Sequence, residues 1–219
     1  KGKHHHLRKK IGKIAELASG YQGWIGAWKA FGASEFFTDP EIKDAILAWR
    51  AASPRVVDLW SGLERAAHSA VSTPGLFAEY NGIGYHMDGD VLFCTLLSGR
   101  RIAYHRPRLS PNPDRGGMSL SFEGYNTNPK AGAIGWVRMN TWGGKLTENV
   151  VQAVARDILA HAIVNLEAAG YPVVLHIHDE IVSQLRKGEG CLLEFERIMA
   201  TMPAWCRDWP IGAAGGWRG

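Results

Sequence analysis

The tetrapeptide His178-Asp179-Glu180-Ile181 constrains the fold of this chain more than any other feature, because it separates two apolar runs, residues 172–177 and 181–185. A run rich in Val, Ile and Leu that is interrupted by two acids and then resumes predicts two strands joined by a two-residue connection. Asp and Glu are poor strand residues, and Asp tolerates turn conformations. We therefore expect a β-hairpin that carries the carboxylates of Asp179 and Glu180 at its tip.

Two roles are open to these carboxylates. Adjacent acids at an exposed turn are usually only solvated. Carboxylate oxygens are also the ligands that a divalent cation takes when it binds beside substrate phosphates. The flanking residues favour the second role, because His176 and His178 lie beside the acids and an imidazole can donate a hydrogen bond to a phosphate.

A long helix is predicted immediately before the hairpin. Apolar residues recur there at helical spacing, namely Val150, Val151, Val154, Ile158 and Leu159. We expect this helix to begin at Thr147, as its N-cap, and to end near Ala169, because Gly170 and Pro172 stop it. Gln152 then lies one turn into the helix.

Near the N-terminus, Lys9, Lys13, Leu17 and Tyr21 follow one another at intervals of four residues. On an α-helix this spacing places them in one inclined stripe. The stripe is cationic in its first turns and apolar or aromatic in its last, which suits a triphosphate at one end and a base pair at the other. A basic amphipathic helix with its apolar face in the core gives the same pattern.

The two motifs, in this order along the chain, resemble those of the DNA polymerase I family (family A), especially its bacteriophage-type members. Residues 174–182 are similar to the last polymerase motif of that family. The N-terminal stripe is similar to the fingers helix, in which an Arg-x3-Lys-x3-aromatic-x3-Tyr pattern binds the incoming nucleotide. The family arginine falls on Lys9 or on its neighbour Arg8, and Leu17 stands where many members carry Phe or Tyr.

Residues 91–104 predict two strands joined by a Ser-Gly turn, with the paired arginines Arg100 and Arg101 after it. This segment resembles the Thr-x-x-Gly-Arg-Arg segment that lies between fingers and palm in the family. A guanidinium group there would hold template or primer phosphates. A basic turn that faces water is the alternative for either arginine.

The resemblance implies a DNA-directed DNA polymerase, a nucleotidyltransferase in which a primer 3′ hydroxyl attacks a dNTP with the help of two Mg²⁺ ions. It implies that Asp179 and Glu180 hold metal and that they are catalytic together with Lys13. The nucleotide-binding residues that it implies are Arg8, Lys9, Lys13, Leu17 and Tyr21. The residues that it implies for contacts with primer-template DNA are Gln152, His178, Arg100, Arg101 and Lys145.

Family members take a second metal-binding Asp from a motif upstream of the fingers helix, and this sequence has no match to that motif. We therefore expect the C-terminal part of a polymerase, inactive without an N-terminal fragment or subunit that carries this Asp. A split enzyme, a fragment and a decayed gene all stay open as origins. The alternative function is a non-catalytic DNA-binding remnant or accessory subunit, and a metal-dependent nuclease ranks third.

The composition agrees with a globular protein, since 46% of the 219 residues are apolar and 21% are charged. The net charge of +4 is modest, but residues 1–13 hold six Lys or Arg, and such an end favours polyanionic partners. No run approaches the length of a membrane span and no leader is recognised, so we expect a cytoplasmic protein, in the host cytoplasm if the source is a phage.

The pattern of the chain predicts an α+β fold. Residues 1–80 are expected to form a helical fingers module, with helices that start at Thr38-Asp39-Pro40 and at Pro54. Residues 81–219 are expected to form part of a palm, with an antiparallel sheet and packed helices.

Overall fold

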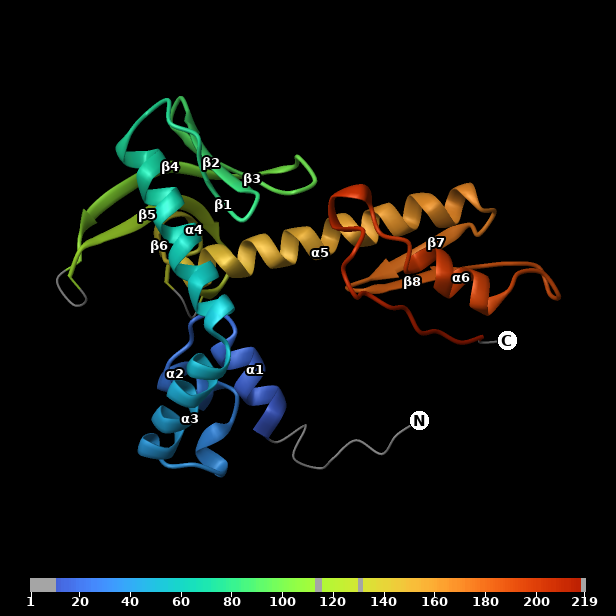
Figure 1. Cartoon of the computed structure of the whole chain (residues 1–219), viewed down its shortest axis with the longest axis horizontal. Coiled ribbons are helices and arrows are strands. Elements are labelled where there is room, and N and C mark those ends of the chain that lie inside the picture. The colour runs from blue at the N-terminus through green and yellow to red at the C-terminus, as the bar shows by residue number, and fades with distance from the viewer. Residues whose placement is uncertain (1–10, 113–115, 130–131, 218–219) are drawn as a thin grey trace. The chain divides into compact units, whose positions relative to one another are not determined.

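The computed structural model describes residues 11–112, 116–129 and 132–217. The chain divides into two compact units, Lys1–Val150 and Val151–Gly219. The boundary falls within the long helix α5 (Gly143–Ala168). Figure 1 shows helices and strands in both units, so the α+β class predicted from the sequence is confirmed.

Four helices open the first unit: α1 (Lys13–Ser19), α2 (Ile25–Ala30), α3 (Asp39–Ala52) and α4 (Pro54–Ser72). The two predicted helix starts are confirmed. At the first, the main-chain N–H of Thr38 donates to Glu41 Oε2 at 2.8 Å, which closes a capping box. At the second, Pro54 occupies the first position of α4, where its missing N–H costs nothing.

The helices α1, α2 and α3 enclose a small apolar core around Trp28, Ile42 and Ile46, which are at most 1% exposed. The indole N–H of Trp28 donates to Ser19 Oγ at 3.0 Å, so the polar edge of this buried ring is satisfied. On α4, the indole N–H of Trp60 donates to the carbonyl oxygen of Gly20 at 3.0 Å. These two bonds fix the chain where α1 ends.

A six-stranded antiparallel sheet completes the first unit, with the strands in chain order. The strands are β1 (Ala78–Tyr80), β2 (Ile83–Asp88), β3 (Val91–Thr95), β4 (Arg101–Pro111), β5 (Met118–Asn126) and β6 (Gly135–Thr141). The predicted hairpin at residues 91–104 is confirmed as β3 and β4. In Figure 1, α4 lies against the sheet. The inner face of the sheet buries Tyr85, Leu92 and Tyr104.

The second unit contains most of α5, the hairpin strands β7 (Val173–Ile177) and β8 (Glu180–Ser183), and α6 (Leu192–Met199). Its core is formed by Leu166, Tyr171 and Ile198. The predicted helix is confirmed to end one residue before Ala169, but it begins at Gly143 and not at Thr147. Thr147 is buried inside the helix, where its hydroxyl donates to the carbonyl oxygen of Gly143 at 2.8 Å.

None of the helices in the described ranges is long and apolar enough to cross a membrane.

Candidate functional site

One side of α1 borders a cavity of about 400 Å³ in the first unit. Lys13 and Leu17, which lie one turn apart on the helix, both line it. Across from them, the lining includes Phe31 and Phe36, whose side chains are 49% and 44% exposed. The cavity therefore combines one ammonium group and one carboxylate, that of Glu35, with open apolar surface. Such a lining can accept a ligand that is anionic at one end and flat or apolar at the other.

The helix α1 is shorter than the stripe predicted from the sequence. It ends at Ser19, so Tyr21 lies in the turn that follows and not on the helix. The cause is a reversal of the chain at Gln22, which has a left-handed φ of +65°, held by the bonds of Trp28 and Trp60 to the end of α1. Lys13 and Leu17 thus share one helix face, whereas Arg8 and Lys9 lie outside the described residues.

The turn after α1 meets the beginning of α5. The side-chain oxygen of Gln22 accepts a hydrogen bond from the main-chain N–H of Gly144 at 2.8 Å. A Cβ on Gly144 would lie 2.2 Å from the carbonyl oxygen of Tyr21, so only glycine allows this approach. Lys145 follows directly and pairs with Glu148 at 3.0 Å. Tyr21 and Lys145, which are predicted to contact nucleotide and DNA, thus lie in segments that pack together.

A second cavity of about 400 Å³ adjoins this contact, since Gln22 and Trp142 both line it. It also contains His68 and Thr141, whose Nε2 and Oγ1 atoms are buried without a hydrogen-bond partner among the described residues. Burial lowers the pKa of His68, and the charge of the nearby Glu64 only partly opposes this. No sequence signal distinguishes His68, because it lies on an ordinary amphipathic helix.

Of the two predicted arginines, Arg101 is the first residue of β4 and Arg100 directly precedes it. Arg101 is exposed, and its guanidinium carbon lies 4.6 Å from the centroid of the Phe93 ring. The main chain of Arg100 closes the turn between β3 and β4, because its carbonyl oxygen accepts from the N–H of Leu96 at 2.8 Å. Both residues thus occupy the confirmed hairpin.

In the second unit, the acidic hairpin is shifted by one residue from the predicted turn. The two-residue turn is His178-Asp179, and Glu180 is the first residue of β8, opposite Ile177. The reason lies in the backbone of His178, which takes the left-handed conformation with φ of +52° and so reverses the chain one residue early. The side chains of His178, Asp179 and Glu180 are all exposed.

The chemistry of this turn fits half of a divalent metal site. Asp179 and Glu180 supply two exposed, adjacent carboxylates, and among the described residues neither forms an ion pair. Hard oxygen ligands of this kind suit Mg²⁺, which usually binds through one or two carboxylates together with waters and phosphates. No group of three or more His, Cys, Asp or Glu side chains that could hold a metal ion is found in the described ranges.

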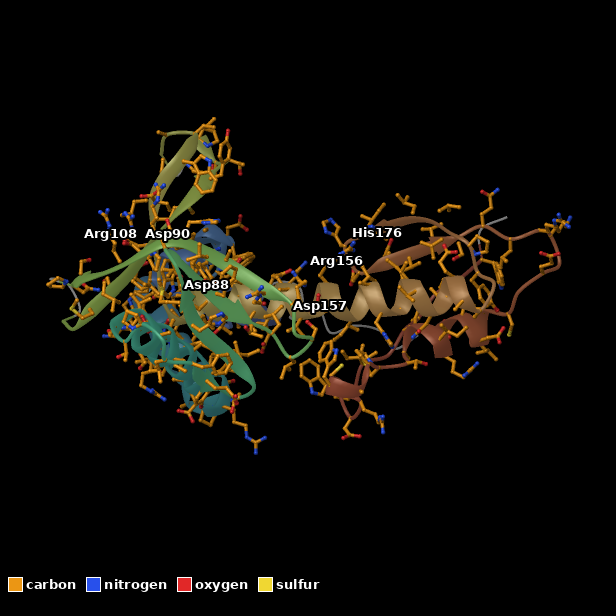
Figure 2. The ribbon with its side chains drawn as sticks, turned by 90° about the horizontal axis from the view of Figure 1, so that it is seen from above. Asp88, Asp90, Arg108, Arg156, Asp157 and His176 are labelled. Carbon is orange, nitrogen blue, oxygen red and sulfur yellow. The ribbon has the colours of Figure 1, made fainter. Side chains whose placement is uncertain are left out.

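A basic contact joins α5 to the hairpin. Arg156 lies one turn after the exposed Gln152, and its guanidinium nitrogens are 3.3 and 3.4 Å from the two ring nitrogens of His176. Figure 2 shows Arg156 and His176 directed toward one another, with Asp157 beside them. Gln152 is predicted from the sequence as a contact for primer-template DNA, but Arg156 is not. The four-residue spacing of the two residues was the available signal, because it places them on one face of the helix.

The chain is similar to a protein named DNA polymerase from Bacillus phage SP02, with 40% identity over 210 residues. The similarity covers 95% of this chain and 32% of the phage protein, so the chain spans about a third of the length of that relative. No protein-family model and no solved structure matches the chain. The chain is therefore a homologue of a phage DNA polymerase.

Proposed function

We propose that this chain forms the fingers and part of the palm of a family A DNA polymerase, and that it acts in template-directed transfer of a nucleotide from a dNTP to a primer 3′ hydroxyl. The observation that carries the proposal is the similarity of 95% of the chain to a phage DNA polymerase. The motifs that suggested the family lie within the described residues, except for Arg8 and Lys9.

The cavity beside α1 is the proposed place for the incoming nucleotide. Lys13 provides an ammonium group that can neutralise the triphosphate, while Leu17, Phe31 and Phe36 provide apolar surface for the base and sugar. Tyr21 lies four residues after Leu17 and would pack beside the nascent base pair. Arg8 or Lys9 would add a second cation toward the phosphates.

The carboxylates of Asp179 and Glu180 are the proposed metal ligands. Bound Mg²⁺ would neutralise the charge that develops on the phosphates during transfer. The role of this chain would be to present the two carboxylates at a turn in which His178 takes the left-handed conformation. The second metal-binding Asp of the family would come from polymerase sequence outside this chain.

The hairpin also leaves room for such a further segment. Leu175, Ile177 and Val182 lie on one face of the two-stranded sheet and are 50%, 48% and 43% exposed. A two-stranded sheet with an open apolar face is rarely stable on its own. We propose that a strand carrying the second Asp pairs with an edge of this hairpin, and that further polymerase sequence packs on its apolar face.

Contacts with primer and template are proposed for two groups of residues. Gln152, Arg156 and His176 form one polar group on α5 and β7, and His178 adds an imidazole at the turn. Arg100, Arg101 and Lys145 form the other group, in the first unit. Arginine suits phosphate because it donates two parallel hydrogen bonds.

A chimaera tests the proposal. In it, this chain replaces the matching third of the Bacillus phage SP02 polymerase, and extension of a primer-template is measured with Mg²⁺ and dNTP. We expect extension, and we expect Lys13→Ala to raise the dNTP concentration needed by about ten- to a hundredfold, as for the loss of a hydrogen bond to a charged group. Lys43→Ala, on the exposed side of α3, is the matched control. A well-folded chimaera that binds primer-template but cannot extend it supports the non-catalytic alternative.

A further inference from the structure

The six-stranded sheet of the first unit has two faces of very different character. Residues Tyr85, Leu92 and Tyr104 are at most 2% exposed on the inner face, where α4 packs and where Tyr104 accepts a hydrogen bond from Asn149 of α5. The residues that alternate with them in the strand register belong to the outer face. This outer face is rich in aromatic rings and arginines.

One aromatic row crosses the outer face from Phe77, just before β1, over β2 and β3, and meets Arg101 at the start of β4. The rings of Phe77 and His86 have centroids 6.0 Å apart, and those of His86 and Phe93 are 5.8 Å apart. The guanidinium of Arg101 then lies 4.6 Å from the Phe93 ring. Phe77 is 55% exposed and covers Gly84, where a Cβ would lie only 2.1 Å from the ring. The sequence thus keeps a glycine beneath an exposed aromatic ring.

A second aromatic group lies on β4, β5 and β6. The centroid of the Trp136 ring is 5.7 Å from that of His105 and 6.3 Å from that of Tyr125. Trp136 and Tyr125 are directly opposite in the register and are 65% and 58% exposed. Two large rings that stay this exposed contribute little to the core, so they are available to an external ligand.

Arginines accompany both groups. Glu123 lies between Arg106 and Arg138, at 2.8 and 3.0 Å from their guanidinium nitrogens, and so it is neutralised within the face. Arg101 and Arg108 form no ion pair among the described residues.

The main chain gives these arginines their positions. A bulge between His105 and Arg108 puts Arg106 in the left-handed conformation with φ of +45°. Arg108, labelled in Figure 2, lies on β4 directly opposite Ser121 of β5. Asp90 accepts from Arg106 Nε at 3.5 Å, while Asp88 lies on the same face as His105. Arg101 and Arg108 are therefore left for an anionic partner, on the face that also carries the exposed rings of Phe77, Tyr125 and Trp136.

From this arrangement we infer that the outer face of the sheet binds single-stranded DNA. Exposed aromatic rings stack on bases of any sequence, and guanidinium groups bind the backbone phosphates that pass between them. Duplex DNA hides its base faces, so it cannot use the rings in this way. Stacking should carry most of the affinity, because on the described part of this face just two arginines, Arg101 and Arg108, form no ion pair. The inference goes beyond the proposed polymerase function, since binding here needs neither metal nor nucleotide.

The experiment measures fluorescence anisotropy of a labelled dT20 strand with the full chain in EDTA, over a series of salt concentrations. Trp136→Ala should weaken binding about fivefold or more, as expected for one lost base stack, and should leave the salt dependence unchanged. Arg108→Gln should reduce the slope of log affinity against log salt by about 0.7, as expected for one lost phosphate contact to a single strand.

Two matched controls accompany these variants. Trp217 is 60% exposed in the second unit, and Arg55 is exposed near the start of α4, so Trp217→Ala and Arg55→Gln should bind dT20 like the parent chain. Trp136→Phe keeps a ring and should keep most of the affinity, which separates stacking from a loss of folding. The inference is overturned if dT20 does not bind, if Trp136→Ala and Arg108→Gln bind like the parent, or if the controls weaken binding equally. These outcomes are independent of primer extension by the chimaera.

Discussion

Gln22 and Gly144 lie 122 residues apart in the sequence, yet the side-chain oxygen of Gln22 accepts a hydrogen bond from the main-chain N–H of Gly144 at 2.8 Å. The bond satisfies a donor at the beginning of α5, where the first N–H groups of a helix have no partner within the helix. It ties the turn that contains Tyr21 to the helix that contains Lys145. The distant segments of the first unit are thus held together by the side chain of Gln22, a residue whose backbone has a left-handed φ of +65°.

We predict that Gln22→Ala lowers the free energy of unfolding by about 1 kcal/mol, because the hydrogen bond is lost and a left-handed φ remains. Gln22→Gly also loses the bond, but glycine accepts a φ of +65° without strain, so its loss should be smaller. Urea unfolding of the three proteins measures the difference. A greater loss for Gln22→Gly would show that backbone strain at this position is unimportant.

At Gly62 we predict that substitution by alanine destabilises the protein, although the same substitution usually stabilises a helix. Gly→Ala inside a helix normally stabilises by about 1 kcal/mol. On α4, however, a Cβ at Gly62 would lie 2.3 Å from the ring of Tyr80. We expect Gly62→Ala to destabilise by about 1–3 kcal/mol, as overpacking does. The control is Gly26→Ala on α2, where nothing lies within 4 Å of the new Cβ and stability should be kept or raised. Thermal unfolding distinguishes the two variants, and equal effects would contradict the contact between α4 and β1.

Glu123 predicts a dependence of stability on acid pH. Burial raises the pKa of this carboxyl, but hydrogen bonds and charges from Arg106 and Arg138 outweigh burial, so its pKa lies below the ordinary value of 4.5. Between these two pKa values the folded chain binds fewer protons than the unfolded chain. The contribution of Glu123 to the free energy of unfolding is therefore fully present above pH 4.5 and is lost as the pH falls through the lowered pKa.

The midpoints of urea unfolding at pH 7 and pH 3.5 test whether Glu123 contributes to the loss of stability in acid. Glu123→Gln should lower the midpoint at pH 7 and should show a smaller drop on acidification than the parent chain. Glu189→Gln, at an exposed position in the second unit, should behave like the parent. An unchanged drop in Glu123→Gln would mean that other carboxylates govern the acid response.

The sequence predicted those elements whose signals are local. The hairpin at residues 91–104 follows from alternation and a Ser-Gly turn, and the start of α3 follows from its capping residues. The prediction that the helix begins at Thr147 was wrong. The helix α5 begins at Gly143 and Gly144, which contact Trp60 and Tyr21, residues far from them in the sequence. Tertiary contacts of this kind override local preference.

The same limit applies to the candidate site. The carboxylates at the hairpin and the Lys13–Leu17 pair could be found from spacing alone. The contact of Arg156 with His176 depends on how α5 packs on β7, and the aromatic outer face depends on the register of β5 and β6. Spacing places Arg156 on the helix face of Gln152, but it shows neither the contact with His176 nor the aromatic face.

The measurement that tests the central claim most directly is single-turnover primer extension by the chimaera with Asp179→Asn. Loss of a metal-binding carboxylate should lower the rate by about a thousandfold or more, while the affinity for primer-template should hardly change. Asp208→Asn, at an exposed position of the same unit, should extend the primer at the parent rate. If Asp179→Asn also extends at the parent rate, Asp179 is not a metal ligand and the proposed mechanism is wrong.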